Sequence, residues 1–121
     1  MSESFDFGRE AESFAVNYFQ SLGYEIIKQN YFYQKAEIDL ILKNSNQVVI
    51  VEVKARSSKI WTNPEDAVTF KKKKLLISAA HQFILENNLD AEIRFDILAL
   101  VKQYGKWEVN HIIDAFNAFE L

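Results

Sequence analysis

The chain has 121 residues, the size of one domain with one hydrophobic core, and its 49% hydrophobic composition excludes a disordered or low-complexity protein. It contains no cysteine, no apolar run of membrane-span length and no signal-peptide pattern, so we expect a single domain over residues 1–121, without disulfides or a membrane partner, in the cytoplasm. The net charge of -3 does not exclude a nucleic-acid partner, because seven basic and two acidic residues give residues 54–74 a local charge of +5 and leave -8 for the rest.

The first predicted element is a helix over residues 7–22, where apolar side chains recur at helical spacing and Gly23 supplies a C-terminal stop. Glu12 lies at the edge of its apolar face, half turned towards the core. Three segments rich in branched and aromatic residues follow and are predicted to be strands, namely 24–33, 37–43 and 47–54. The polar residues 44–46 join the last two as a hairpin.

The second half of the chain is predicted to contain a core helix and two more strands. Asn63-Pro-Glu-Asp has the pattern of a short helix opening, and Thr69 is placed to cap a longer helix over 70–87. Strands are predicted over 93–101 and 106–112, and the last residues, 115–121, form a turn or short helix. The order α-β-β-β-α-β-β predicts an α/β fold with a mixed five-stranded sheet flanked by helices.

The predicted hairpin gathers charge at its open end. With the loop centred on residues 45 and 46, Asp39 faces Glu52 and Glu37 faces Lys54. The opposite face of the hairpin is wholly apolar and consists of Ile38, Leu40, Leu42, Val49, Val51 and Val53. Nearer the loop, the face that carries the charges is apolar and consists of Ile41, Val48 and Ile50.

Two carboxylates directly opposite each other on a sheet repel, so the Asp39–Glu52 pair needs a compensating charge. Mg²⁺ or Mn²⁺ would supply it, because these cations take oxygen ligands and also bind phosphate. Lys54 lies on the face of Glu52, where an ammonium orients an attacking water or stabilises charge on a phosphoryl group. The alternative is a solvated strand end held by salt bridges among Glu37, Asp39, Glu52 and Lys54.

A series of short motifs runs in order from Gly8 to Phe116. They are Gly8-x-x-Ala-Glu12 with Ala15, Leu22-Gly-Tyr, Asn30, Glu37-Ile-Asp39-Leu-Ile, Val51-Glu-Val-Lys54-Ala-Arg56-Ser57, Pro64-Glu-x-Ala-Val68, Lys72, Arg94-Phe-Asp96 and Ala115-Phe. Together they resemble the bacterial YraN-type uncharacterised family, which is classed with the restriction-endonuclease-like, PD-(D/E)xK folds and is related in shape to archaeal Holliday junction resolvases.

The resemblance implies a metal-dependent nuclease or a nucleic-acid-binding protein. Asp39, Glu52 and Lys54 match the D…ExK positions of the family, and Glu12 matches the glutamate of the first helix that approaches the metal. The chain departs from the family pattern at Ala11 and Ala36, where glycine is usual, and it has no proline before Asp39. These departures concern the local backbone and leave the proposed ligands Asp39, Glu52 and Glu12 in place.

The basic residues near this hairpin are predicted to contact the nucleic-acid backbone, with a solvated charged surface as the alternative. They are Arg56, Lys59 and Lys71, Lys72, Lys73 and Lys74, together with Ser57 in the loop after the hairpin. Arg94 and Asp96 lie on one face of their strand and are interpreted as a structural pair, and neither His81 nor His111 is assigned a catalytic role.

Three functional hypotheses follow from these patterns. The first is a Mg²⁺- or Mn²⁺-dependent endonuclease that hydrolyses phosphodiester bonds in DNA, with branched or repair-related DNA as the expected substrate class. The second is a non-catalytic nucleic-acid-binding module on the same fold. A protein–protein scaffold with a relic site is a third. Phe116, Phe119 and Leu121 either cover the sheet edge or mediate a homodimer.

Overall fold

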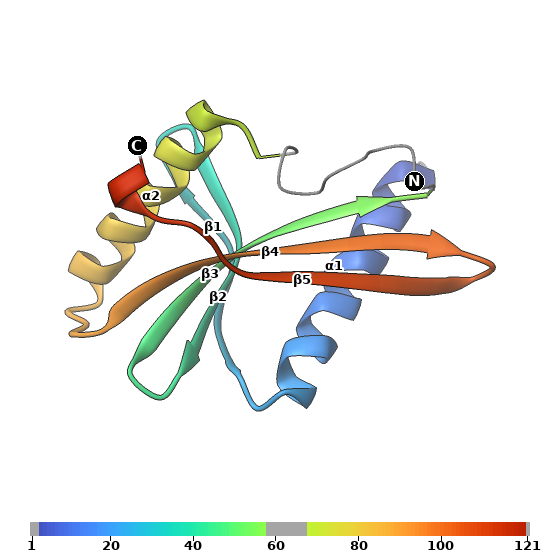
Figure 1. Ribbon diagram of the computed structural model, residues 1–121, viewed down its shortest axis with the longest axis horizontal. Coiled ribbons are helices and arrows are strands. Elements are labelled where there is room, and N and C mark those ends of the chain that lie inside the picture. Colours follow the sequence, from blue (N-terminus) through green and yellow to red (C-terminus); the bar gives the residue numbers. More distant parts are fainter. Residues whose placement is uncertain (1–2, 58–67, 121) are drawn as a thin grey trace.

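The computed structural model describes residues 3–57 and 68–120 and shows one sheet with a helix on either side (Figure 1). Its helices and strands are α1 (Glu3–Ser21), β1 (Glu25–Tyr33), β2 (Ala36–Asn44), β3 (Gln47–Arg56), α2 (Phe70–Glu86), β4 (Glu92–Gln103), β5 (Lys106–Phe116) and the 3₁₀ helix η2 (Ala118–Glu120). The predicted order α-β-β-β-α-β-β is confirmed. The predicted short helix at residues 63–66 lies outside the described residues, as does Lys59.

The sheet has the strand order β1-β2-β3-β4-β5, which is mixed as predicted. β3 and β4 are parallel and are connected through α2, whereas every other neighbouring pair is antiparallel. A parallel pair needs such a crossover, because the chain must return to the same end of the sheet. Within the described residues, none of the helices has the length and apolar character to cross a membrane.

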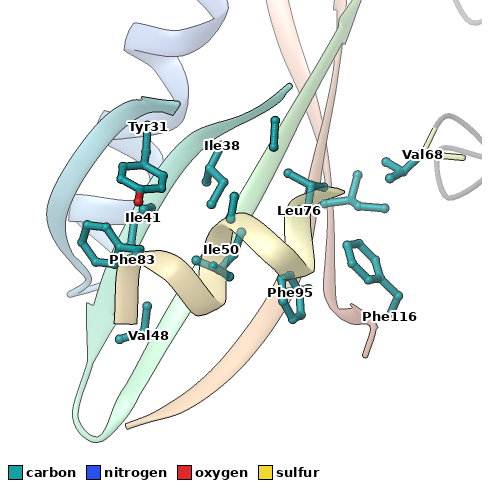
Figure 2. Close-up of a cluster of buried hydrophobic side chains, with 14 residues drawn as sticks. Tyr31, Ile38, Ile41, Val48, Ile50, Val68, Leu76, Phe83, Phe95 and Phe116 are labelled. Carbon is teal, nitrogen blue, oxygen red and sulfur yellow. The ribbon is translucent and has the colours of Figure 1, made fainter. Parts of the chain in front are cut away.

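Two hydrophobic clusters hold the helices against opposite faces of the sheet. Beneath α2, Leu76 and Phe83 pack against buried side chains of the sheet that include Ile41 and Ile50 (Figure 2). The cluster beneath α1 consists of Ala11, Ala15, Phe19, Leu40, Leu42, Val49, Val51, Leu98 and Leu100. β3 and β4 are covered on both sides, which explains why their sequences are almost continuously apolar.

Local signals in the sequence set the ends of both helices. α1 is followed by Gly23 at φ 92°, and the Tyr24 N–H donates to the Phe19 carbonyl, which closes the last turn. Thr69 caps α2, as predicted, because its side-chain oxygen accepts from the Lys72 N–H. These caps fix where Glu12 and Lys72 lie along their helices.

The β2–β3 hairpin has the predicted register near its loop but not at its open end. Leu40 pairs with Val51, and the ladder continues from there to the loop. Beyond Leu40 the ladder ends, so the predicted cross-strand pairing of Asp39 with Glu52 is wrong. Ile38 packs beneath α2 and not with Leu40, so its predicted face is also wrong. The alternation is interrupted at Asp39. On β1, the residue between the partners of Leu40 and Ile38 is Asn30, whose φ is 53°.

The last strand is longer than the sequence predicted. β5 continues to Phe116, and only η2 remains of the predicted C-terminal turn. Phe116 is buried and stacks on Phe95 with ring centres 5.0 Å apart, so this residue packs within the chain. Phe119 is fully exposed, and Leu121 lies outside the described residues.

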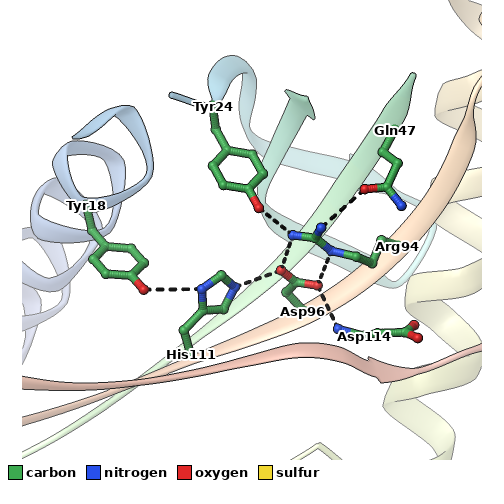
Figure 3. A network of polar contacts seen from close by, with 7 residues as sticks. All are labelled: Tyr18, Tyr24, Gln47, Arg94, Asp96, His111 and Asp114. Atoms are coloured by element: carbon green, nitrogen blue, oxygen red, sulfur yellow. Dashed lines mark hydrogen bonds and ion pairs between the residues drawn. The ribbon is translucent and has the colours of Figure 1, made fainter. Parts of the chain in front are cut away.

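A buried polar network fastens β4 and β5 to α1 (Figure 3). The Arg94 guanidinium donates to both oxygens of Asp96, at 2.9 and 2.8 Å, which confirms the predicted structural pair. His111 Nε2 donates to Asp96 at 2.7 Å, and its Nδ1 forms a hydrogen bond with the Tyr18 hydroxyl at 3.2 Å. The Asp114 N–H completes the set of donors around the carboxylate. His111 therefore has a structural partner on each ring nitrogen.

Candidate active site

Asp39 lies where β2 and β3 stop pairing and separate in space (Figure 1). Its Oδ2 accepts a hydrogen bond from the Val53 N–H at 2.7 Å. This bond takes the place of a ladder bond and draws the carboxylate of β2 towards the backbone of β3. The end of the ladder therefore brings Asp39 close to Glu52 without making the two residues cross-strand partners.

Glu52 is the buried anion of the site, with 5% of its surface exposed. Its Oε1 lies 3.1 Å from Lys72 Nζ and 3.9 Å from Lys54 Nζ. Among the described residues, its buried Oε2 has no hydrogen-bond partner. An unpaired buried carboxylate oxygen is costly, so this oxygen is suited to a ligand that supplies positive charge.

The carboxylates at this site repel one another. Burial, the charge of Glu52 and the contact with Glu52 raise the pKa of Asp39 to about 7, although the Val53 N–H opposes the shift. The pKa of Glu37 is also raised, first by burial and then by the charges of Asp39 and Glu12. The lysines of the site thus leave part of its negative charge uncompensated.

Glu12 reaches the site from α1. It lines a cavity of about 210 Å³ together with Asp39, and the remaining walls are small or apolar residues of α1 and β3. Within the described part of the chain, no three His, Cys, Asp or Glu side chains are close enough together to hold a metal ion. The geometry therefore gives two adjacent carboxylates, Asp39 and Glu52, and Glu12 lines the same cavity as Asp39.

Lys72 belongs to this site, whereas the sequence indicated only a nucleic-acid contact for it. It forms the closer of the two ion pairs of Glu52, from the first turn of α2. A signal was present in the sequence, because Lys72 precedes Leu76 by four residues and Ala79 by seven. These spacings place Lys72 on the buried stripe of α2.

The two lysines influence each other. Burial and the charge of Lys72 lower the pKa of Lys54, although Glu52 opposes the shift. Burial also disfavours the charged form of Lys72, but its contacts with Glu52 outweigh that effect and raise its pKa. Lys72 is therefore the principal counterion of Glu52. The charged form is less favoured in Lys54 than in Lys72.

The residues predicted to contact nucleic acid differ in their exposure and in their neighbours. Lys71 and Lys74 are exposed, but Lys74 Nζ lies 5.5 Å from the centre of the Phe70 ring. Lys73 Nζ lies 5.4 Å from the centre of the Phe116 ring, and Lys72 pairs with Glu52. The two remaining described residues, Arg56 and Ser57, are exposed at and after the end of β3, close in sequence to Lys54.

The fold and the site define a small α/β protein with a carboxylate and lysine cluster where two strands of a mixed sheet separate. The chain belongs to Uncharacterised protein family UPF0102, whose model matches residues 11–100. A UPF0102 protein of Flavobacterium psychrophilum is 43% identical over 98% of this chain and 100% of its own length. UPF0102 proteins of Christiangramia forsetii and Natranaerobius thermophilus are 41% and 43% identical and are covered over 100% and 95% of their lengths.

Proposed function

We propose that this protein is a Mg²⁺- or Mn²⁺-dependent phosphodiesterase that hydrolyses the DNA backbone, with branched or repair-related DNA as its substrate class. One observation carries the proposal: the carboxylates of Asp39 and Glu52 lie together beside two lysines, and one buried oxygen of Glu52 has no partner in the part of the chain that the structure describes. The architecture is compatible with the restriction-endonuclease-like fold that the sequence resembles.

The residues present fit a divalent cation. Asp39 and Glu52 would supply oxygen ligands, and this assignment is supported by the Glu52 Oε2, which has no hydrogen-bond partner among the described residues. Mg²⁺ commonly keeps several waters and uses only one or two carboxylates. Glu12, which lines the same cavity as Asp39, would act through such a water.

The reaction consumes one water and needs no other reactant. The water oxygen forms a bond to phosphorus and gives up one proton, the bond from phosphorus to the leaving sugar oxygen breaks, and that sugar oxygen keeps the electron pair and takes up one proton. A divalent cation, when bound, withdraws charge from the phosphoryl oxygens and lowers the pKa of water. Lys54, beside Glu52, orients the attacking water and donates to the phosphoryl oxygen on which charge develops.

The exposed basic side chains would hold the DNA strand. Lys71 lies on the same turn of α2 as Lys72, and Arg56 and Ser57 follow Lys54 after one intervening residue, Ala55. Contacts of this kind bind the phosphate backbone irrespective of base sequence and weaken with salt. Preference among DNA structures would then come from the shape of the strand that enters the site.

The test is incubation of the purified protein with branched, single-stranded and duplex DNA in the presence of Mn²⁺. We expect cleavage of at least one substrate, and we expect EDTA to abolish it because the carboxylates are then left without their cation. The absence of cleavage from all three substrates would overturn the proposal.

The same experiment distinguishes a second candidate function, a non-catalytic DNA-binding module. The observation that favours this candidate is the group of exposed basic residues at the start of α2 and the end of β3, which does not depend on the carboxylates. A binding module would retain salt-sensitive DNA binding in the Asp39→Ala variant and leave all the DNA intact.

A further inference from the structure

The first turn of α2 contains a lysine in an electrostatically unfavourable position. The start of a helix carries partial positive charge and disfavours cations, yet this turn has lysines and no acidic residue. Lys72 has a specific compensation there, because its ammonium lies 3.1 Å from the buried Glu52 Oε1. The carboxylate, and not the helix, therefore holds the Lys72 side chain in place.

The ion pair is asymmetric in its burial. The Glu52 side chain is 5% exposed, whereas that of Lys72 is 37% exposed. The Lys72 backbone is anchored by the bond from its N–H to Thr69 Oγ1, at 3.2 Å. Since a lysine has a long flexible stem, the ammonium has a route to solvent that leaves α2 unchanged.

One ammonium does not balance the charge of this site. Lys72 occupies Glu52 Oε1, while Oε2 has no partner among the described residues. A divalent cation between Asp39 and Glu52 would compensate both carboxylates at once. It would also repel an ammonium at 3.1 Å from one of its ligands, so the two cations compete for Glu52.

We propose that Lys72 is the resident counterion of Glu52, that a divalent cation displaces it, and that the displaced ammonium then binds a DNA phosphate. This inference rests on the proposed function, since it needs a cation at Asp39 and Glu52. Lys72 is a positioning residue in this scheme: it keeps the buried carboxylate in place in the metal-free protein. Metal binding then frees the Lys72 ammonium, which adds a positive charge beside Lys71 on the surface that faces the DNA strand.

The test is a calorimetric Mn²⁺ titration without DNA. We expect Lys72→Gln to bind Mn²⁺ about tenfold more tightly than the wild type, because the cation no longer competes with a charged hydrogen bond. Lys71→Gln is the matched control, since it removes the same charge from the same turn and should change the affinity far less. Lys72→Arg keeps the positive charge and should stay near the wild-type affinity. A lysine with a merely structural role would, on removal, loosen the site and weaken binding.

A second measurement uses the wild-type protein, in case Lys72→Gln does not fold without metal. The NMR signal of the Lys72 ammonium, assigned by its loss in Lys72→Arg, should shift on saturation with Mg²⁺, while that of Lys71 stays in place. An unchanged Lys72 signal, or equal or weaker Mn²⁺ binding by Lys72→Gln, overturns the inference while the metal site stands. Failure of the wild type itself to bind either cation overturns the proposed function and this inference together.

Discussion

Asp39→Asn should lower the rate of DNA cleavage by at least about 100-fold without destabilising the protein. Asparagine retains an oxygen that accepts from the Val53 N–H, so the local backbone stays in place. The variant removes one of two charges that repel each other, and its melting temperature should therefore equal or exceed that of the wild type. Loss of activity with unchanged or higher stability is typical of residues that serve catalysis.

Lys54→Ala should reduce cleavage to a similar extent while Mn²⁺ binding remains. Lys54 Nζ lies 3.9 Å from Glu52 Oε1 and would donate to the reacting phosphate, and removal of such a donor typically costs about 100- to 1,000-fold in rate. Lys43→Ala is the matched control, because Lys43 is exposed near the loop of the same hairpin. Cleavage by Asp39→Asn or Lys54→Ala at the wild-type rate would contradict the assignment of these residues.

Asp96→Ala should reduce the free energy of unfolding by about 3–5 kcal/mol, because it leaves the largely buried Arg94 charge without its carboxylate. The same change removes the acceptor of His111 and of the Asp114 N–H. Asp114→Asn is the control, since only the backbone of Asp114 takes part in the network, and this change should stay within about 0.5 kcal/mol. Urea unfolding at pH 7 measures both effects, and a loss below about 1 kcal/mol for Asp96→Ala would contradict this role of the network.

The contribution of Asp96 to the free energy of unfolding should also depend on pH, and it should decrease as the pH falls. Burial opposes ionisation of Asp96, but the bonds from His111, Arg94 and the Asp114 N–H outweigh burial and lower its pKa. A lowered carboxyl pKa stabilises the fold at pH values above the unfolded-state pKa of about 4, and this contribution is lost as the pH falls through the folded-state pKa. The difference between wild type and Asp96→Ala should therefore shrink when unfolding is measured at pH 3 instead of pH 7.

Much of the fold follows from patterns within short segments. The position of the polar loop, centred on residues 45 and 46, predicted the register that pairs Leu40 with Val51, and the helix-capping chemistry of Thr69 predicted the start of α2. The face of Ile38 was predicted incorrectly, because strict alternation assumes an uninterrupted ladder. The ladder ends where the Val53 N–H donates to the Asp39 side chain and not to its backbone. No periodicity in the sequence indicates that a side chain replaces the backbone as the acceptor.

The candidate site could be predicted only in part for a similar reason. Asp39, Glu52 and Lys54 lie on one hairpin, so the short connection between β2 and β3 keeps them near one another even though Asp39 lies beyond the end of the ladder. Lys72 reaches Glu52 from a helix 20 residues later in the chain, and its stripe position in α2 was the only local indication. The hydrogen bond of His111 to Tyr18 spans 93 residues and depends on how α1 packs against β5, which a single sequence does not specify.

The central claim is that Asp39 and Glu52 form a divalent-cation site, and calorimetric titration of Mn²⁺ into the metal-free protein tests it most directly. Glu52→Gln is the decisive variant, because it removes the charge while it preserves the size of a buried side chain whose Oε2 has no partner within the described residues. We predict that the wild type binds Mn²⁺ and that Glu52→Gln does not. Equal binding by both proteins, or no binding by the wild type, would contradict the claim.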